Sequence, residues 1–136
     1  MRRNVRGLFA VLAIVGFVMS GIAFAGDSLR LRAKLRAPSD FGDISGHAKY
    51  RESDNGRRRF SVEIEGMSPG DRFEVVVDQV TVGAVTVDSF GVGELELDTN
   101  LEQGDDEGPL PAGFPGLRGG EFVEIGPLSG TLQRKR

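Results

Sequence analysis

Five carboxylates fall close together near residue 100, in a segment rich in glycine and proline. Calcium takes carboxylate oxygens as ligands, and extracellular modules bind it through loops. The spacing does not match an EF-hand, because the D-x-[DN]-x-[DN]-G pattern with its distal glutamate is absent. A calcium site therefore competes with a simply solvated acidic loop. The candidate ligands are Asp98, Glu102, Asp105, Asp106 and Glu107.

Three consecutive arginines, Arg57, Arg58 and Arg59, form a second group with binding chemistry. Guanidinium groups make bidentate contacts with carboxylates and phosphates, so this run suits an acidic polysaccharide or the phosphates of lipopolysaccharide. Arg51 and the basic residues 134–136 would extend such a patch. The alternative is that the three arginines flank a hairpin and pair with nearby acids.

Catalysis finds little support among the remaining residues. His47 is the single histidine, and no Gly-x-Ser-x-Gly elbow accompanies it, so Ser–His–acid catalysis is not indicated. The pairs Glu63/Glu65 and Glu94/Glu96 lack the tryptophans and multiple tyrosines expected around a sugar-cleaving cleft. The absence of cysteine excludes thiol catalysis and thiolate metal sites. We therefore expect no enzyme activity, and no cofactor beyond the calcium considered above.

Residues 1–25 have the three parts of an export signal. Residues 1–7 include three arginines and no acid, residues 8–18 are apolar throughout, and Ala23-Phe24-Ala25 predicts cleavage before Gly26. The alternative is an uncleaved anchor, which would be the only link to a membrane. No cysteine follows the apolar stretch, so a lipoprotein anchor is excluded. The sequence predicts a secreted or periplasmic protein that uses the general secretory route.

The exported chain would be one mildly acidic domain. Cleavage leaves 111 of the 136 residues, with 14 basic and 20 acidic side chains and a net charge of −6. This length is sufficient for a hydrophobic core without disulfides. A nucleic-acid-binding domain usually has a strongly basic surface, so nucleic acid is not an expected partner.

Apolar and polar residues alternate with a period of two through most of this domain, which is typical of half-buried strands. Turn signals separate the segments, including Asn55-Gly56, Pro69-Gly70 and Asp78-Gln79. No segment has the period of a helix. The predicted strands span residues 28–37, 46–52, 59–65, 73–77, 80–87, 92–98, 121–125 and 128–133, the last two joined at Gly126-Pro127.

Seven to eight short strands predict an all-β fold, an antiparallel β-sandwich of the immunoglobulin-like or Greek-key kind. It would form a single domain over residues 26–136, preceded by the signal-peptide helix. Residues 99–120 lack periodicity and are predicted to form one long loop. The basic residues 134–136 follow the last strand as a tail.

The first predicted strand carries a cation at every second position, from Arg30 to Arg36. Opposite charges across a strand pair are favourable, and like charges are unfavourable. We therefore expect this strand to lie beside one of the acidic strands, 60–65 or 92–98. It should not pair along its length with the strand of Lys49 and Arg51.

Phe114 lies in the proline-rich segment 109–117 of the long loop. Long loops in compact domains are often functional, and aromatic side chains dominate binding energies at interfaces. Phe114 is therefore a candidate anchor for a partner. The alternative is that it plugs the open end of the fold as part of the core.

Most of the exported chain resembles the chordin-type (CHRD) domain, and it is also similar to short secreted bacterial β-proteins. The resemblance rests on Leu-Arg-Ala-Lys-Leu at residues 31–35, on Gly46 and Ala48, on FSVEIEGM at 60–67, and on GEFVEIGPLSGTL at 120–132. It implies a sandwich-like fold, an extracytoplasmic location and no catalysis. It implies no site residues, because the histidine-bearing segments of that family are missing.

These observations predict a non-enzymatic, secreted or periplasmic module. It would act as an interaction domain, an adhesion-type domain or a structural part of the envelope, with a protein or a matrix component as partner. The alternative is a calcium- or polyanion-binding protein that uses the acidic segment 98–107 or the Arg57–Arg59 run.

Overall fold

The computed structural model describes residues 28–101 and 107–135. The predicted signal peptide and its cleavage site lie outside this part of the chain. The strands are β1 (Leu29–Arg36), β2 (Ser45–Glu52), β3 (Arg58–Glu65), β4 (Arg72–Val77), β5 (Val80–Thr86), β6 (Gly93–Asp98), β7 (Gly108–Pro109), β8 (Phe122–Ile125), β9 (Leu128–Thr131) and β10 (Gln133–Arg134).

The predicted all-β class is confirmed, and the only helical element in the described residues is a 3-10 turn, η4 (Ser39–Phe41). There are more strands than the predicted seven to eight. The additional ones, β7 and β10, are two residues long and too short to show a sequence period. β7 interrupts the predicted long loop, and it pairs in parallel with β6.

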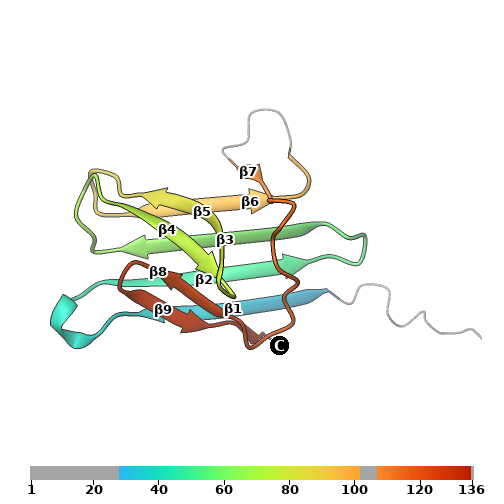
Figure 1. Cartoon of the computed structure of the whole chain (residues 1–136), viewed down its shortest axis with the longest axis horizontal. Coiled ribbons are helices and arrows are strands. Elements are labelled where there is room, and N and C mark those ends of the chain that lie inside the picture. Colours follow the sequence, from blue (N-terminus) through green and yellow to red (C-terminus); the bar gives the residue numbers. More distant parts are fainter. Residues whose placement is uncertain (1–27, 102–106, 136) are drawn as a thin grey trace, which may run out of the picture.

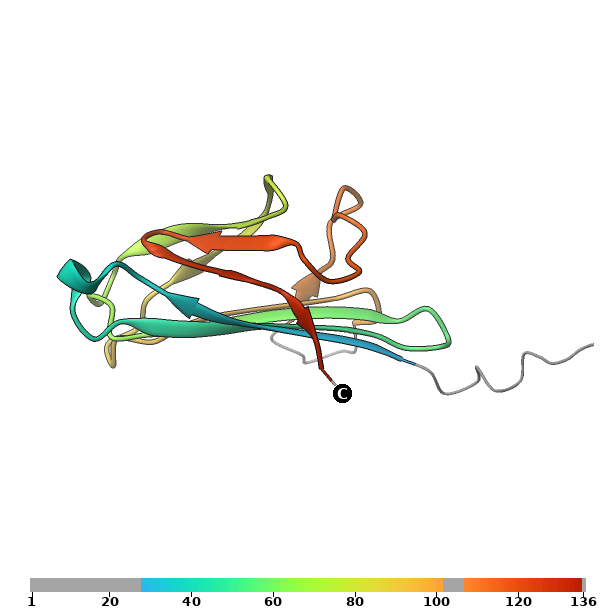
Figure 2. The ribbon, with the colours of Figure 1, turned by 90° about the horizontal axis from the view of Figure 1, so that it is seen from below.

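All strands belong to one mixed sheet, in the order β5-β4-β8-β9-β1-β2-β3-β6-β7, with β10 beside β1. The sheet curls, so β4, β5 and β8 form a layer over β1, β2, β3 and β6 (Figures 1 and 2). A bulge between Val75 and Val76 accompanies this curvature. Gly130 allows β9 to cross close to β1, since a Cβ atom there would collide with the carbonyl oxygen of Lys34.

The hydrophobic core lies between the two layers. The alternation seen in the sequence places Leu31, Ala33 and Leu35 of β1 inside and the intervening cations outside. Val75, Val77, Val123 and Ile125 cover them from the other layer, and each is fully buried; the rest of the core is Ala48, Tyr50, Phe60, Val62, Ile64, Val82, Val85, Val87, Leu97, Phe114, Leu117, Leu128 and Leu132.

The predicted turns account for several connections. Asp78 and Gln79 both have positive φ, 50° and 70°, as a two-residue hairpin turn requires. In the turn after β3, the amide of Asp71 donates to the carbonyl of Ser68 at 3.1 Å, and Gly70 has φ 90°. The turn at Asp78-Gln79 joins the paired strands β4 and β5, whereas the turn after β3 leads to β4, which is not a neighbour of β3 in the sheet.

The expected partner of β1 is wrong. β1 pairs along its whole length with β2, so Arg30 faces Arg51 and Arg32 faces Lys49. Burying one leucine side chain contributes about 1.5–3 kcal/mol. A like-charged pair across a ladder costs only about 0.2–1 kcal/mol. The short segment 37–44 joins the two strands. Burial of their inner side chains therefore outweighs the repulsion between the cations on the outer side.

Candidate functional site

The outer side of β10, β1 and β2 carries a group of basic side chains that we call the cationic face. On β1 and β2 the burial pattern places these cations on the solvent side, opposite to the core residues. β10 extends the group, because the amide of Lys135 donates to the carbonyl of Arg30 at 2.9 Å and alternation then turns Lys135 outward. The members are Arg30, Arg32, Lys34, Arg36, Lys49, Arg51 and Lys135.

The cationic face is uncompensated within the described part of the chain. The outward residues of β1, β2 and β10 include no acid. None of the seven side chains makes an ion pair or hydrogen bond with another described residue. Two rungs, Arg30/Arg51 and Arg32/Lys49, place like charges directly opposite each other. The face therefore has a positive field that an external anion would neutralise.

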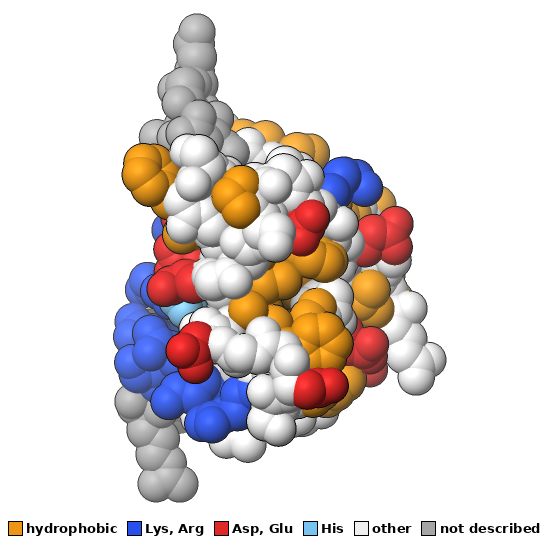
Figure 3. Space-filling view, turned by 90° about the vertical axis from the view of Figure 1, so that its left-hand side faces the viewer, with side chains coloured by type: hydrophobic (Ala, Val, Ile, Leu, Met, Phe, Trp, Pro, Cys, Tyr) orange, Lys and Arg blue, Asp and Glu red, His pale blue; other side chains and the backbone are white. Residues whose placement is uncertain are grey.

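The next two strands of the same layer carry the opposite charge on their outer side, and we call this group the acidic stripe. Glu63 of β3 faces Glu94 of β6, and Glu65 and Glu96 extend the group along the two strands. A hydrogen bond with Glu63 raises the pKa of Glu94. His47 of β2 lies between the two groups, with its Nε2 3.7 Å from Oε1 of Glu63. Figure 3 shows the basic side chains gathered low on one side, with acidic side chains above them.

The predicted patch of Arg57, Arg58 and Arg59 does not form a free basic surface. Arg57 makes two hydrogen bonds to the carboxylate of Asp98, at 3.0 and 2.6 Å. Arg59 lies 3.1 Å from Asp98 and donates to Glu107 at 2.8 Å. These two arginines pair with nearby acids, which is the alternative that the sequence left open.

Arg58 turns toward the core. Its Nε donates to the hydroxyl of Tyr50 at 3.0 Å, and its Nη2 donates to the carbonyl of Pro115 at 3.2 Å. Its guanidinium group also lies 5.5 Å from the ring centre of Phe114. Phe114 itself is only 6% exposed and packs against Tyr50 and Phe60. The side chain of Phe114 therefore belongs to the core, which is the alternative that the sequence left open.

The candidate calcium ligands divide into two groups. Asp98 is buried between arginines, and Glu107 is paired with Arg59. The hydrogen bonds from Arg57 hold the pKa of Asp98 below its usual value, against the opposing effect of burial. Glu102, Asp105 and Asp106 lie outside the described residues. Among the residues described, no three acidic or histidine side chains are grouped so that they could hold a metal ion.

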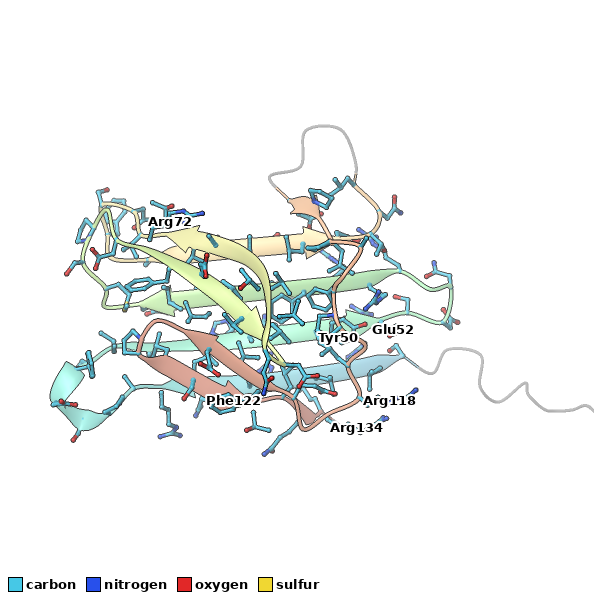
Figure 4. The ribbon with its side chains drawn as sticks, viewed as in Figure 1. Tyr50, Glu52, Arg72, Arg118, Phe122 and Arg134 are labelled. Carbon is cyan, nitrogen blue, oxygen red and sulfur yellow. The ribbon has the colours of Figure 1, made fainter. Side chains whose placement is uncertain are left out.

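An open hollow of about 980 Å³ lies at the end of the fold near residue 28. Figure 4 shows Tyr50, Glu52, Arg118 and Arg134 at this end. The Tyr50 hydroxyl donates to Glu52 at 2.9 Å, and Glu52 lines the hollow together with Arg118 and Arg134. Because Glu52 and Asp54 also line the hollow, its charge is mixed, and it selects a ligand less clearly than the cationic face does.

Sequence reasoning recognised the row of cations in the first strand but took it only as evidence for a strand and for an acidic neighbour. The short connection between residues 36 and 45 would have indicated a hairpin of two basic strands. No helix in the described residues is long and apolar enough to cross a membrane. Comparison with known proteins gives no match to this chain, whether with protein families, curated proteins or solved structures.

Proposed function

We propose that this protein is a non-enzymatic interaction module of the secreted or periplasmic space, and that its cationic face binds a polyanion. The observation that carries the proposal is the pair of like-charged rungs, Arg30/Arg51 and Arg32/Lys49, without a compensating acid. Repulsion of this kind lowers stability, and a bound anion relieves it. The polyanion site proposed here is the outer side of β1 and β2, whereas the sequence suggested the Arg57–Arg59 run.

The chemistry of the cationic face fits carboxylate, sulfate or phosphate groups. Four of its seven cations are arginines, which bind such groups through two parallel N–H donors. An open hollow of about 480 Å³ on this face is lined by Arg32, Ala33, Lys34, His47 and Lys49. Because cations dominate its lining, anion binding is a better interpretation than catalysis. Export by the signal at residues 1–25 would bring it to acidic polymers of the envelope or matrix.

The finer description of the fold belongs to the same proposal. Two β-layers around one core favour a sandwich of the immunoglobulin-like or Greek-key kind, and the resemblance to the chordin-type domain favours the same architecture. Immunoglobulin-like and Greek-key sandwiches are frequent in extracellular recognition modules, which supports an interaction role.

The test is retention of the purified protein on immobilised dextran sulfate, followed by elution with salt. The variant R30Q/R32Q/K49Q removes three charges from the cationic face. The matched control, R72Q/R118Q/R134Q, removes three exposed charges elsewhere (Figure 4).

We expect about tenfold weaker binding for the face variant, if each lost contact contributes roughly 0.5 kcal/mol. The control should bind like the wild type. Equal losses in both variants would mean that only net charge matters, and no binding by the wild type would refute the proposal.

A further inference from the structure

We infer that the occupant of the cationic face is an extended linear polyanion lying along β1, and not a planar anionic surface such as a membrane. This inference rests on the proposed function and specifies its ligand. It comes from the shape of the charge distribution, which is narrow across the strands and long in their direction.

The long dimension follows β1. Arg30, Arg32, Lys34 and Arg36 repeat every second residue, which spaces them about 6.6 Å apart. The row from Arg30 to Arg36 is therefore about 20 Å long. β2 adds a second, parallel row through Lys49 and Arg51, about 4.8 Å away. A polymer with an anionic group on each repeat meets successive cations when it lies in this direction.

The narrow dimension is limited by the acidic stripe. Glu63 on β3 is directly next to His47, and Glu94 on β6 is one strand further. The acidic residues of β6 are therefore about 10 Å from β2, comparable with the screening length of about 8–10 Å in physiological salt. A flat anionic surface that touched the cationic face would also lie close to these carboxylates, and the two effects would oppose each other.

A linear chain over β1 avoids this repulsion. It contacts cations from β10, β1 and β2 and leaves the acidic stripe uncovered. The stripe then acts as a boundary that keeps the polymer parallel to the strands. Single-stranded nucleic acid fits less well, because the proteins that bind it stack bases on exposed aromatic rings, and the outward residues of β1 and β2 include no Phe, Tyr or Trp.

The experiment measures binding of the purified protein to two kinds of probe. The first is a series of linear oligomers of increasing length, with oligouronates and polyphosphates as separate arms to distinguish carboxylate from phosphate. The second is vesicles of zwitterionic lipid containing phosphatidylglycerol. Affinity for one or both oligomer series should rise with length until the oligomer spans about 20 Å and then level off. The vesicles should bind at least tenfold more weakly than the longest oligomers.

Neutralising the acidic stripe tests the boundary. E63Q/E94Q/E96Q should gain vesicle binding about tenfold, while its affinity for the long oligomers changes less. The matched control D71N/E74Q/E124Q removes three exposed acids of other segments and should not gain vesicle binding. A thermal melt of each variant verifies that it is folded.

The outcomes separate the two levels of the proposal. If vesicles bind as tightly as the oligomers, or if affinity does not depend on oligomer length, the inference about a linear ligand is overturned while polyanion binding stands. If neither probe binds to folded wild-type protein, the proposed function itself fails.

Discussion

Arg32 of β1 lies directly opposite Lys49 of β2, on the solvent side of a strand pair whose inner side is fully apolar at this position. Ala33 and Ala48, the next rung, are both buried. The same two strands therefore combine a favourable inner contact with an unfavourable outer one. Selection for stability alone would not retain the repulsion between Arg32 and Lys49. Its presence therefore points to a binding role for these two cations.

Replacing one cation of this rung should stabilise the protein. We expect R32T and K49T each to raise the free energy of unfolding by about 0.2–1 kcal/mol, because each removes the same repulsion. The double variant should gain less than the sum of the two, since either change already removes the pair. Urea denaturation at low and high salt measures this effect, and salt should stabilise the wild type more than the double variant. A loss of stability in both single variants would contradict the interpretation.

Asp98 should contribute stability through its buried ion pairs. Its carboxylate is fully covered and accepts hydrogen bonds from Arg57, so D98N should lower the free energy of unfolding by about 1–3 kcal/mol. The pKa of Asp98 is held below its usual value of 3.8 in the folded protein. The stabilisation is therefore complete well above that value and is lost as the pH falls through the lower, folded pKa.

Urea denaturation of wild type and D98N at several pH values measures this dependence. The two proteins should differ by a constant amount above about pH 5 and converge at more acidic pH. D71N, a change at an exposed aspartate, is the control and should show no such convergence. If the difference in unfolding free energy between wild type and D98N persisted unchanged at low pH, the ionised form of Asp98 would not be the source of its stabilisation.

Phe114 should behave as a core residue. F114A should cost about 3–5 kcal/mol, because the ring packs between Tyr50 and Phe60 and beneath Arg58. F90A is the matched control: Phe90 is 88% exposed, and its truncation should change stability by less than about 0.5 kcal/mol. If F114A does not fold, F114L should show a smaller, measurable loss in a thermal melt. Equal behaviour of F114L and F90A would contradict the assignment to the core.

Tyr50 should ionise at an unusually high pH. Burial raises its pKa above 10.0, the hydrogen bond from Arg58 opposes this, and the contact with Glu52 adds to the increase. The chain has one tyrosine and no tryptophan, so the phenolate absorption reports this residue alone. The midpoint should be above 10 in buffer and near 10 in denaturing urea.

Two further measurements test the causes. E52Q should lower the midpoint of Tyr50, because it removes a charge that disfavours the phenolate. Because the folded pKa is the higher one, the contribution of Tyr50 to stability is present below pH 10 and is lost as the pH rises through the folded pKa. A midpoint that did not respond to unfolding would mean that the hydroxyl is not in the buried network.

Local patterns were sufficient to predict the strands and most turns. Alternation in β1 and the turn at Asp78-Gln79 depend on neighbouring residues, and the structure contains both. The two-residue strands β7 and β10 were not predictable in this way. Each exists only because a longer strand offers free hydrogen-bonding groups beside it.

The site was partly visible in the sequence and partly hidden. The arginines at residues 57–59 are consecutive, so the sequence predicted a basic patch there. Asp98, 41 positions after Arg57, neutralises part of that run. The cations of β1 and β2 are separated in the sequence and become one surface only when the strands pair. Charge pairing rules alone predicted the opposite arrangement, because they omit the burial on the other side of the sheet.

The sequence by itself determined the all-β class, the positions of the long strands and which side of each strand is polar, since these depend on a two-residue period and on turn residues. Only the tertiary structure decided which strands are neighbours, and with that which charges meet and which are neutralised. The physical reason is that strand order is set by the burial of apolar surface from distant segments. The cost of like charges at the surface is small beside it.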